Sequence, residues 1–246
     1  METRAVDIAS RVAEVRARIA EAAARAGRDP ADVLLVAVTK THGLDVIRAA
    51  SEAGLRHFGE NRVYEAEEKI HAARGVLPGD VVWHMIGPIQ SRKARDAATL
   101  FEWVQSVDRL QIANRLSAAV QGRAPIQALV EVNLSGEESK HGFDLSGWPG
   151  NDGQLGALFS AVEKMLALPG FDFQGLMTLA PYTEEPETVR PVFRRLRELR
   201  DALRERFPER EWPHLSMGMS GDYEIAVEEG ATMVRVGTAI FGPREG

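Results

Sequence analysis

The chain begins with an amphipathic pattern that predicts a helix. Its apolar residues repeat with the 4-3-4 spacing of one helix face, at Ile8, Val12, Val15 and Ile19. Arginine and glutamate residues occupy many of the positions between them, and Gly27 predicts the end of the helix because glycine suits the conformation that follows many helices. We therefore expect the apolar face of this segment to pack against the rest of the protein.

Eight short apolar runs follow and predict strands. Their approximate ranges are 33–39, 56–59, 81–86, 102–106, 126–132, 172–178, 214–217 and 232–237. Helical patterns separate them, near 43–54, 60–74, 90–98, 108–120, 155–168, 187–206 and 221–229. Strands that alternate with helices pair in parallel through right-handed crossovers. Eight such units in 246 residues predict an α/β fold, a single closed (β/α)₈ TIM-like barrel with an extra N-terminal helix.

The end of the chain and one internal stretch depart from this regular alternation. The last predicted strand is followed only by AIFGPREG, which is too short for an eighth crossover helix, so we expect the N-terminal helix to cover that gap. Residues 144–156 (DLSGWPGNDGQLG) are rich in turn-forming residues and predict a surface loop. No linker divides the chain, and we expect residues 1–246 to form one domain.

Composition and charge exclude several classes of function. The net charge is −6 and the isoelectric point is about 5.6, which argues against non-specific nucleic-acid binding because that requires a basic surface. No run of about 18 apolar residues occurs, so no transmembrane helix is expected. The absence of cysteine excludes disulfides and thiolate chemistry. Charges interrupt the N-terminal segment as they would not in a signal peptide, and we expect a cytoplasmic monomer.

The first predicted strand ends on a lysine. Residues 34–43 read LLVAVTKTHG, a run typical of a buried strand that stops at Lys40. On the strand alone, a surface lysine is the simpler interpretation. In a TIM-like barrel, however, the C-terminal ends of the strands carry the chemistry, and this placement favours an amine at the mouth of a pocket.

The turns after the last two strands favour a phosphate site. SMGMSGD follows the seventh strand and VGTAIFG the eighth, and both are rich in glycine and hydroxyl residues. Free backbone N–H groups in such turns bind phosphate, and barrels often place a phosphate at these two loops. Tight turns would explain either loop alone. An amine and a phosphate on one rim indicate a Schiff base with a phosphorylated carbonyl compound, either pyridoxal 5′-phosphate (PLP) or a sugar phosphate.

Long motifs in nearly the whole chain resemble one known family. They are AVTKTHGLDVIRAA, HFGENRVYEAEEKI, WHMIGPIQSRKAR, SVDRLQIANRL, VEVNLSGEESKHGF, GLMTLAP and LSMGMSGDYEIAVEEGATMVRVGTAIFG, between about residues 6 and 242. Together they resemble the YggS/PROSC family of pyridoxal phosphate homeostasis proteins. The resemblance implies a barrel like that of alanine racemase, with PLP as the cofactor and PLP-accepting apoenzymes as possible partners.

The resemblance also implies roles for six residues. Lys40 is the Schiff-base lysine, Asn61 is a pocket residue, and Arg235 is the partner of the pyridine nitrogen. Ser216, Gly237 and Thr238 are phosphate contacts. Without the resemblance, an equally good interpretation of Arg235 is that it pairs with a buried acid inside the barrel.

Three functions follow from these residues: a PLP carrier in vitamin B6 homeostasis with little turnover, a PLP-dependent amino-acid racemase, and a Schiff-base aldolase. The resemblance disfavours the aldolase. A two-base racemase needs a second proton acceptor, which alanine racemases bring from a separate domain that we do not expect here.

No pair of histidines has metal-ligand spacing, so no metal is expected, and His84 is expected to be a packed residue. Met217 and Met219 either line the pocket or fill the core.

Overall fold

The computed structural model describes residues 2–120, 122 and 124–243 of the chain. Its strands are β1 (Leu34–Val38), β2 (His57–Glu60), β3 (Val82–Met85), β4 (Trp103–Val107), β5 (Ile126–Asn133), β6 (Phe143–Asp144), β7 (Phe171–Met177), β8 (His214–Ser216) and β9 (Met233–Val236). Its helices are α1 (Glu2–Arg25), α2 (Leu44–Glu52), α3 (Val63–Ala73), α4 (Ala94–Leu100), α5 (Leu110–Ala119), α6 (Asp152–Leu166), α7 (Arg190–Arg206), α8 (Tyr223–Glu228) and α9 (Thr238–Phe241). Three short 3₁₀ helices span Pro30–Asp32, Ser91–Lys93 and Pro186–Val189.

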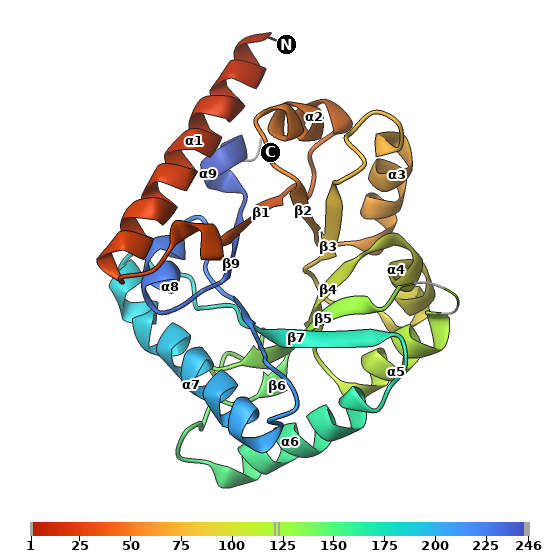
Figure 1. Cartoon of the computed structure of the whole chain (residues 1–246), viewed down its shortest axis with the longest axis vertical. Coiled ribbons are helices and arrows are strands. Elements are labelled where there is room, and N and C mark those ends of the chain that lie inside the picture. The colour runs from red at the N-terminus through yellow and green to blue at the C-terminus, as the bar shows by residue number, and fades with distance from the viewer. Residues whose placement is uncertain (1, 121, 123, 244–246) are drawn as a thin grey trace.

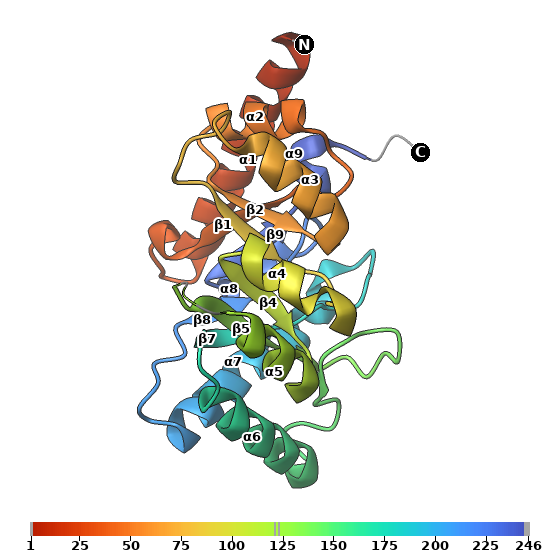
Figure 2. The ribbon, with the colours of Figure 1, turned by 90° about the vertical axis from the view of Figure 1, so that its right-hand side faces the viewer.

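Eight parallel strands close into a barrel. Their order is β4-β3-β2-β1-β9-β8-β7-β5, and a further pairing of β4 with β5 closes the sheet. Figure 1 shows these strands inside a ring of helices, and Figure 2 shows α2 to α6 following one another around the outside. The predicted TIM-like barrel with an extra N-terminal helix is therefore confirmed.

The N-terminal helix completes the ring on the side where the chain returns to its first strand. Helix α1 contacts α2, α8 and the four-residue helix α9 that follows β9. The apolar stripe predicted from the sequence forms this contact, since Ile8, Val12, Val15 and Ile19 are all buried. Helix α1 therefore covers the part of the barrel that the short α9 leaves uncovered.

The expected surface loop at 144–156 is only partly a loop. Phe143 and Asp144 form β6, which adds to β5 outside the barrel sequence, and Leu145 is fully buried. Helix α6 already begins at Asp152, because the side chain of Asn151 caps it by accepting a hydrogen bond from the N–H of Gln154. Gly153 and Gly156, which disfavour a helix, concealed this start in the sequence.

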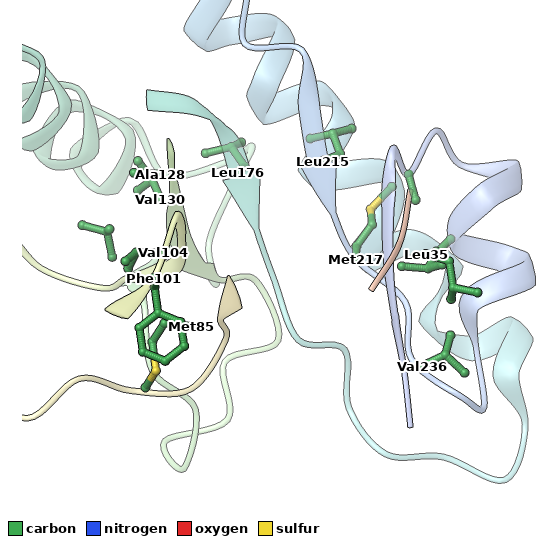
Figure 3. Close-up of a cluster of buried hydrophobic side chains, with 14 of the residues drawn as sticks. Leu35, Met85, Phe101, Val104, Ala128, Val130, Leu176, Leu215, Met217 and Val236 are labelled. Atoms are coloured by element: carbon green, nitrogen blue, oxygen red, sulfur yellow. The ribbon is translucent and has the colours of Figure 1, made fainter. Parts of the chain in front are cut away.

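Two faces of each strand have different surroundings. The larger apolar cluster lies between the strands and the helices, and Figure 3 shows part of it, including Met217, which is fully buried. Inside the barrel a small cluster of Leu129, Met177 and Met233 packs with partly buried neighbours. Because side chains alternate along a strand, Arg235 lies on the same inner face as Met233. Arg235 therefore projects into the barrel interior, two residues nearer than Met233 to the C-terminal end of β9.

Candidate functional site

A cavity of about 240 Å³ lies at the C-terminal end of the barrel. It is lined by Val38, Lys40, Pro181, Tyr182, Thr183, Met219, Ser220, Gly221, Asp222, Arg235, Gly237 and Thr238. These residues come from the ends of β1 and β9 and from the loops after β7 and β8. The volume is near the lower end of the range of about 300–1,000 Å³ that is usual for small-molecule pockets. The cavity therefore suits a small ligand.

Lys40 stands on a firmly held strand end. The preceding residue, Thr39, is fully buried and donates from its hydroxyl to the Glu60 carboxylate at 2.7 Å. Lys69 donates to that carboxylate at 2.9 Å and to the carbonyl oxygen of Thr39 at 2.8 Å. Burial raises the pKa of Glu60, although the charge of Lys69 acts against this shift. This cluster fixes the backbone from which Lys40 reaches the cavity.

The two turns predicted to hold phosphate meet at Ser220. Its hydroxyl oxygen accepts hydrogen bonds from the backbone N–H groups of Gly237 and Ala239, each at 3.2 Å. A Cβ atom on Gly237 would lie 3.3 Å from the Val38 side chain and carbonyl oxygen, so a side chain there would crowd the end of β1. Ser220 thus joins the loop after β8 to the turn after β9, and both turns line the cavity.

Arg235 brings a positive charge to the floor of the cavity. It is only 3% exposed, and it donates to the Ser216 hydroxyl and to the Thr178 carbonyl oxygen, the latter at 2.9 Å. Burial lowers its pKa to about 10, while the charges of Asp222 and Glu131 oppose that shift. It therefore remains protonated at neutral pH, and its described hydrogen bonds go to neutral oxygens rather than to a buried acid.

The structure brings four of the six predicted site residues into this cavity. Lys40, Arg235, Gly237 and Thr238 line it, whereas Ser216 and Asn61 are not among its lining residues. Ser216 is fully buried behind Arg235, and its hydroxyl donates to the Gln105 side-chain oxygen at 2.7 Å. Asn61 lines a separate cavity of about 470 Å³ together with Arg62 and Arg109. The geometry favours Ser220 over Ser216 as the serine beside the turns.

The histidine and methionine residues singled out in the sequence lie partly in the core and partly at the cavity. His84 is fully buried, and its Nε2 lies 2.9 Å from Nδ1 of His57, as expected for a packed residue. Among residues 2–120, 122 and 124–243, no group of three or more His, Cys, Asp or Glu side chains could hold a metal. Met217 belongs to the core, whereas Met219 is 38% exposed and lines the cavity. No helix in the described part of the chain has the length and apolar character needed to cross a membrane.

Comparisons with known proteins identify the family. The family described as "Alanine racemase, N-terminal domain" matches residues 11–245. The pyridoxal phosphate homeostasis protein of Pseudomonas aeruginosa is 47% identical over 239 residues, which cover 97% of this chain and 96% of that relative. The chain belongs to the pyridoxal phosphate homeostasis protein family. The resemblance found in the sequence motifs is thereby confirmed.

Solved structures agree with this family at two levels of similarity. PipY of Synechococcus elongatus, solved with PLP bound, is 36% identical, has a TM-score of 0.80, and is matched over 96% of this chain and 100% of PipY. Alanine racemase of Corynebacterium glutamicum is 20% identical with a TM-score of 0.64, and the match covers 98% of this chain and 61% of that enzyme. The second likeness concerns the fold alone.

Several residues of the site were not predicted from the sequence. Ser220 stands in the quoted SMGMSGD motif, but no local pattern distinguishes it from Ser216. Tyr182 and Asp222 also line the cavity, and no local sequence pattern marks either of them. Burial raises the pKa of Asp222, and the backbone N–H of Met219, which donates to its carboxylate, opposes this shift. The loop after β8 is therefore shaped by side chains as well as by glycine.

Proposed function

We propose that this chain binds PLP in the 240 Å³ cavity through a Schiff base on Lys40 and takes part in intracellular PLP homeostasis with little turnover. The observation that carries the proposal is the meeting of the Lys40 amine, the Arg235 guanidinium and two Ser220-linked turns in one cavity. PLP has an aldehyde that condenses with a primary amine and a phosphate that suits backbone N–H groups. The name of the P. aeruginosa relative and the PLP bound to PipY support it.

Each of these residues would contact a different part of PLP. Gly237 and Thr238, with the Ser220 loop, would hold the phosphate, and Lys40 would hold the aldehyde carbon. Arg235 would donate to the pyridine nitrogen, and Ser216 would support Arg235 from behind. Asn61, which lines a second cavity at the end of β2, would act as a further pocket residue. We place this activity in the cytoplasm, with apoenzymes that require PLP as the receiving partners.

Arg235 accounts for the low turnover that we propose. PLP promotes removal of a substrate proton best when its ring nitrogen is protonated, and an arginine can only donate to that nitrogen. We expect Arg235→Glu, at matched PLP occupancy, to exchange the α-proton of a bound amino acid for deuterium faster than the wild type. Unchanged exchange would remove this argument, and rapid racemisation by the wild type would favour the racemase instead.

The decisive experiment is borohydride reduction of the PLP-loaded protein followed by peptide mapping. We expect the pyridoxyl group on Lys40 and none on the Lys40→Ala variant. Lys93→Ala is the matched control, because Lys93 is a surface lysine paired with Asp96 at 2.7 Å. A pyridoxyl group on Lys93 or Lys140 would show that the assignment is wrong.

A further inference from the structure

A chain of side-chain hydrogen bonds crosses the barrel interior behind the cavity. Arg235 bonds to Ser216, Ser216 to Gln105 at 2.7 Å, Gln105 to His84 at 3.0 Å, and His84 to His57 at 2.9 Å. Each of the five residues comes from a different strand, namely β9, β8, β4, β3 and β2. The chain therefore ties the strand that carries Arg235 to strands on the opposite wall.

The chemistry of arginine sets the direction of every bond in this chain. Arginine can only donate, so the Ser216 oxygen accepts from it and the Ser216 hydroxyl donates to the side-chain oxygen of Gln105. The amide nitrogen of Gln105 then faces Nδ1 of His84, which must accept. The proton of a neutral His84 therefore lies on Nε2 and points to Nδ1 of His57. Burial lowers the pKa of His84 well below its usual value, which agrees with a neutral ring.

The middle of this hydrogen-bond chain is isolated from water. Ser216, Gln105 and His84 are fully buried, so a broken bond could not be replaced by solvent. The Trp103 ring is stacked on His84 with 5.5 Å between ring centroids, and this contact restricts rotation of the imidazole. An unpaired buried polar group costs about 1–3 kcal/mol, so the loss of one link disturbs its neighbours.

We propose that Gln105 is a positioning residue for Arg235. Its side-chain oxygen accepts the hydrogen bond from the Ser216 hydroxyl, which leaves a lone pair of the Ser216 oxygen directed toward the guanidinium. Together with the Thr178 carbonyl oxygen, this contact fixes the orientation in which Arg235 lines the cavity. That Arg235 meets the ring nitrogen of PLP rests on the proposed function, whereas the orientation of Arg235 does not.

The first test needs no ligand. Gln105→Met keeps a similar volume but removes both polar atoms. In ¹⁵N-labelled protein we expect the slowly exchanging guanidinium N–H signals of Arg235, assigned by their loss in Arg235→Met, to broaden or disappear. Ser106→Ala is the matched control, because the Ser106 hydroxyl is equally buried but donates to the Gly87 carbonyl oxygen. Unchanged Arg235 signals in Gln105→Met would overturn the proposal, whatever the protein binds.

The second test uses PLP. We expect Gln105→Met to bind PLP about tenfold more weakly, which corresponds to about 1.4 kcal/mol, and to shift the visible absorption band in the same direction as Arg235→Met. The double variant should show no further shift, because both changes act on one group. A full additional shift would overturn the proposal. Ser216→Ala removes the next link and replaces Gln105→Met in both tests if that variant does not fold.

Failure of this inference can be distinguished from failure of the proposed function. If the wild type does not bind PLP, the proposed function is wrong, and the guanidinium signals still decide the role of Gln105. If PLP binds to Lys40 but Gln105→Met changes neither the Arg235 guanidinium signals nor the absorption band, only the positioning role is wrong. Gln105→Glu retains an acceptor for Ser216, and its fully buried carboxyl group, which burial favours in the protonated form, can donate to Nδ1 of His84. This variant should therefore keep the wild-type signals, which a general loss of core packing would not allow.

Discussion

Glu131 is a buried acid whose charge is costly to the folded protein. It lies on β5, is 3% exposed, and one of its carboxylate oxygens is buried without a hydrogen bond among the described residues. Burial raises its pKa to about 7, the charge of Asp108 adds to the shift, and Arg235 opposes it. The folded state therefore binds a proton on Glu131 more tightly than the unfolded chain does.

We expect Glu131→Gln to stabilise the protein above neutral pH and not below about pH 4.5, the ordinary pKa of glutamate. Because the folded pKa is raised, the wild type loses stability as pH rises from the unfolded pKa through the folded one. A shift from 4.5 to about 7 corresponds to an upper limit of about 3 kcal/mol. Urea unfolding of both proteins at pH 5 and pH 8.5 measures the difference. Equal stability at pH 8.5 would contradict it.

The turn at Gly237 and Thr238 should distinguish ligands with and without a phosphate. Gly237→Asp adds a carboxylate where the phosphate is proposed to lie, and it also crowds Val38. We expect this variant and Thr238→Val to weaken binding of PLP at least tenfold more than binding of pyridoxal. Gly237→Asn is the control, because it adds similar bulk without the charge. Equal losses for both ligands in every variant would show that these turns do not hold the phosphate.

At the scale of elements, one glutamate connects the last two crossover helices of the barrel, α7 and α8. Glu229 follows α8, its side chain is 6% exposed, and three arginines of α7 surround it: Arg190, Arg194 and Arg197, at 3.0–3.3 Å. Burial alone would raise the pKa of Glu229, but hydrogen bonds from Arg194 and Arg190 outweigh it and the pKa is lowered. The ion-pair cluster therefore fixes α7 against α8, beside the loop that lines the cavity.

Replacing this glutamate should loosen the packing of α7 on α8. We expect Glu229→Ala to lower the free energy of unfolding by about 2 kcal/mol, because three partly exposed arginines lose a shared partner. Glu14→Ala is the control, since Glu14 pairs with Arg18 on an exposed face of α1 and should cost less than about 1 kcal/mol. Chemical denaturation of the three proteins makes the comparison. A cost for Glu229→Ala no larger than that for Glu14→Ala would contradict the structural role.

The elements that were predictable are those whose sequence pattern is local. All eight barrel strands follow from buried apolar runs, and α1 follows from the stripe that includes Val12 and Val15. The start of α6 was missed because its signal, the Asn151 cap, is a single side-chain contact amid glycines. The Gln105 chain joins residues from five strands, and no local pattern records which inward side chains meet inside a closed barrel. For the same reason Ser216 and Ser220 could not be separated.

At the scale of the whole molecule, α1 is part of the barrel's outer layer. Val12 is 1% exposed, and α1 contacts the helices α2, α8 and α9 on the side of the barrel where β1 pairs with β9. We expect Val12→Asp to destabilise the protein by more than about 3 kcal/mol, because it buries an unpaired charge. Ala13→Asp, on the exposed side of the same helix, should have little effect. Thermal unfolding tests the pair, and similar melting temperatures for the two variants would show that α1 is dispensable.

Pairing of β1 with β9 also determines when the cavity can exist during protein synthesis. Val36 of the first strand lies beside Arg235 of the last barrel strand, so neighbours in space are far apart in the order of synthesis. Lys40 emerges early, while the turn at Gly237 emerges after every other strand has been made. A nascent chain contains Lys40 before it contains the turn at Gly237, and the edge of β1 that pairs with β9 stays unpaired until β9 has been made. The cavity that Lys40 and Gly237 line therefore forms only after β9 has been made and has paired with β1.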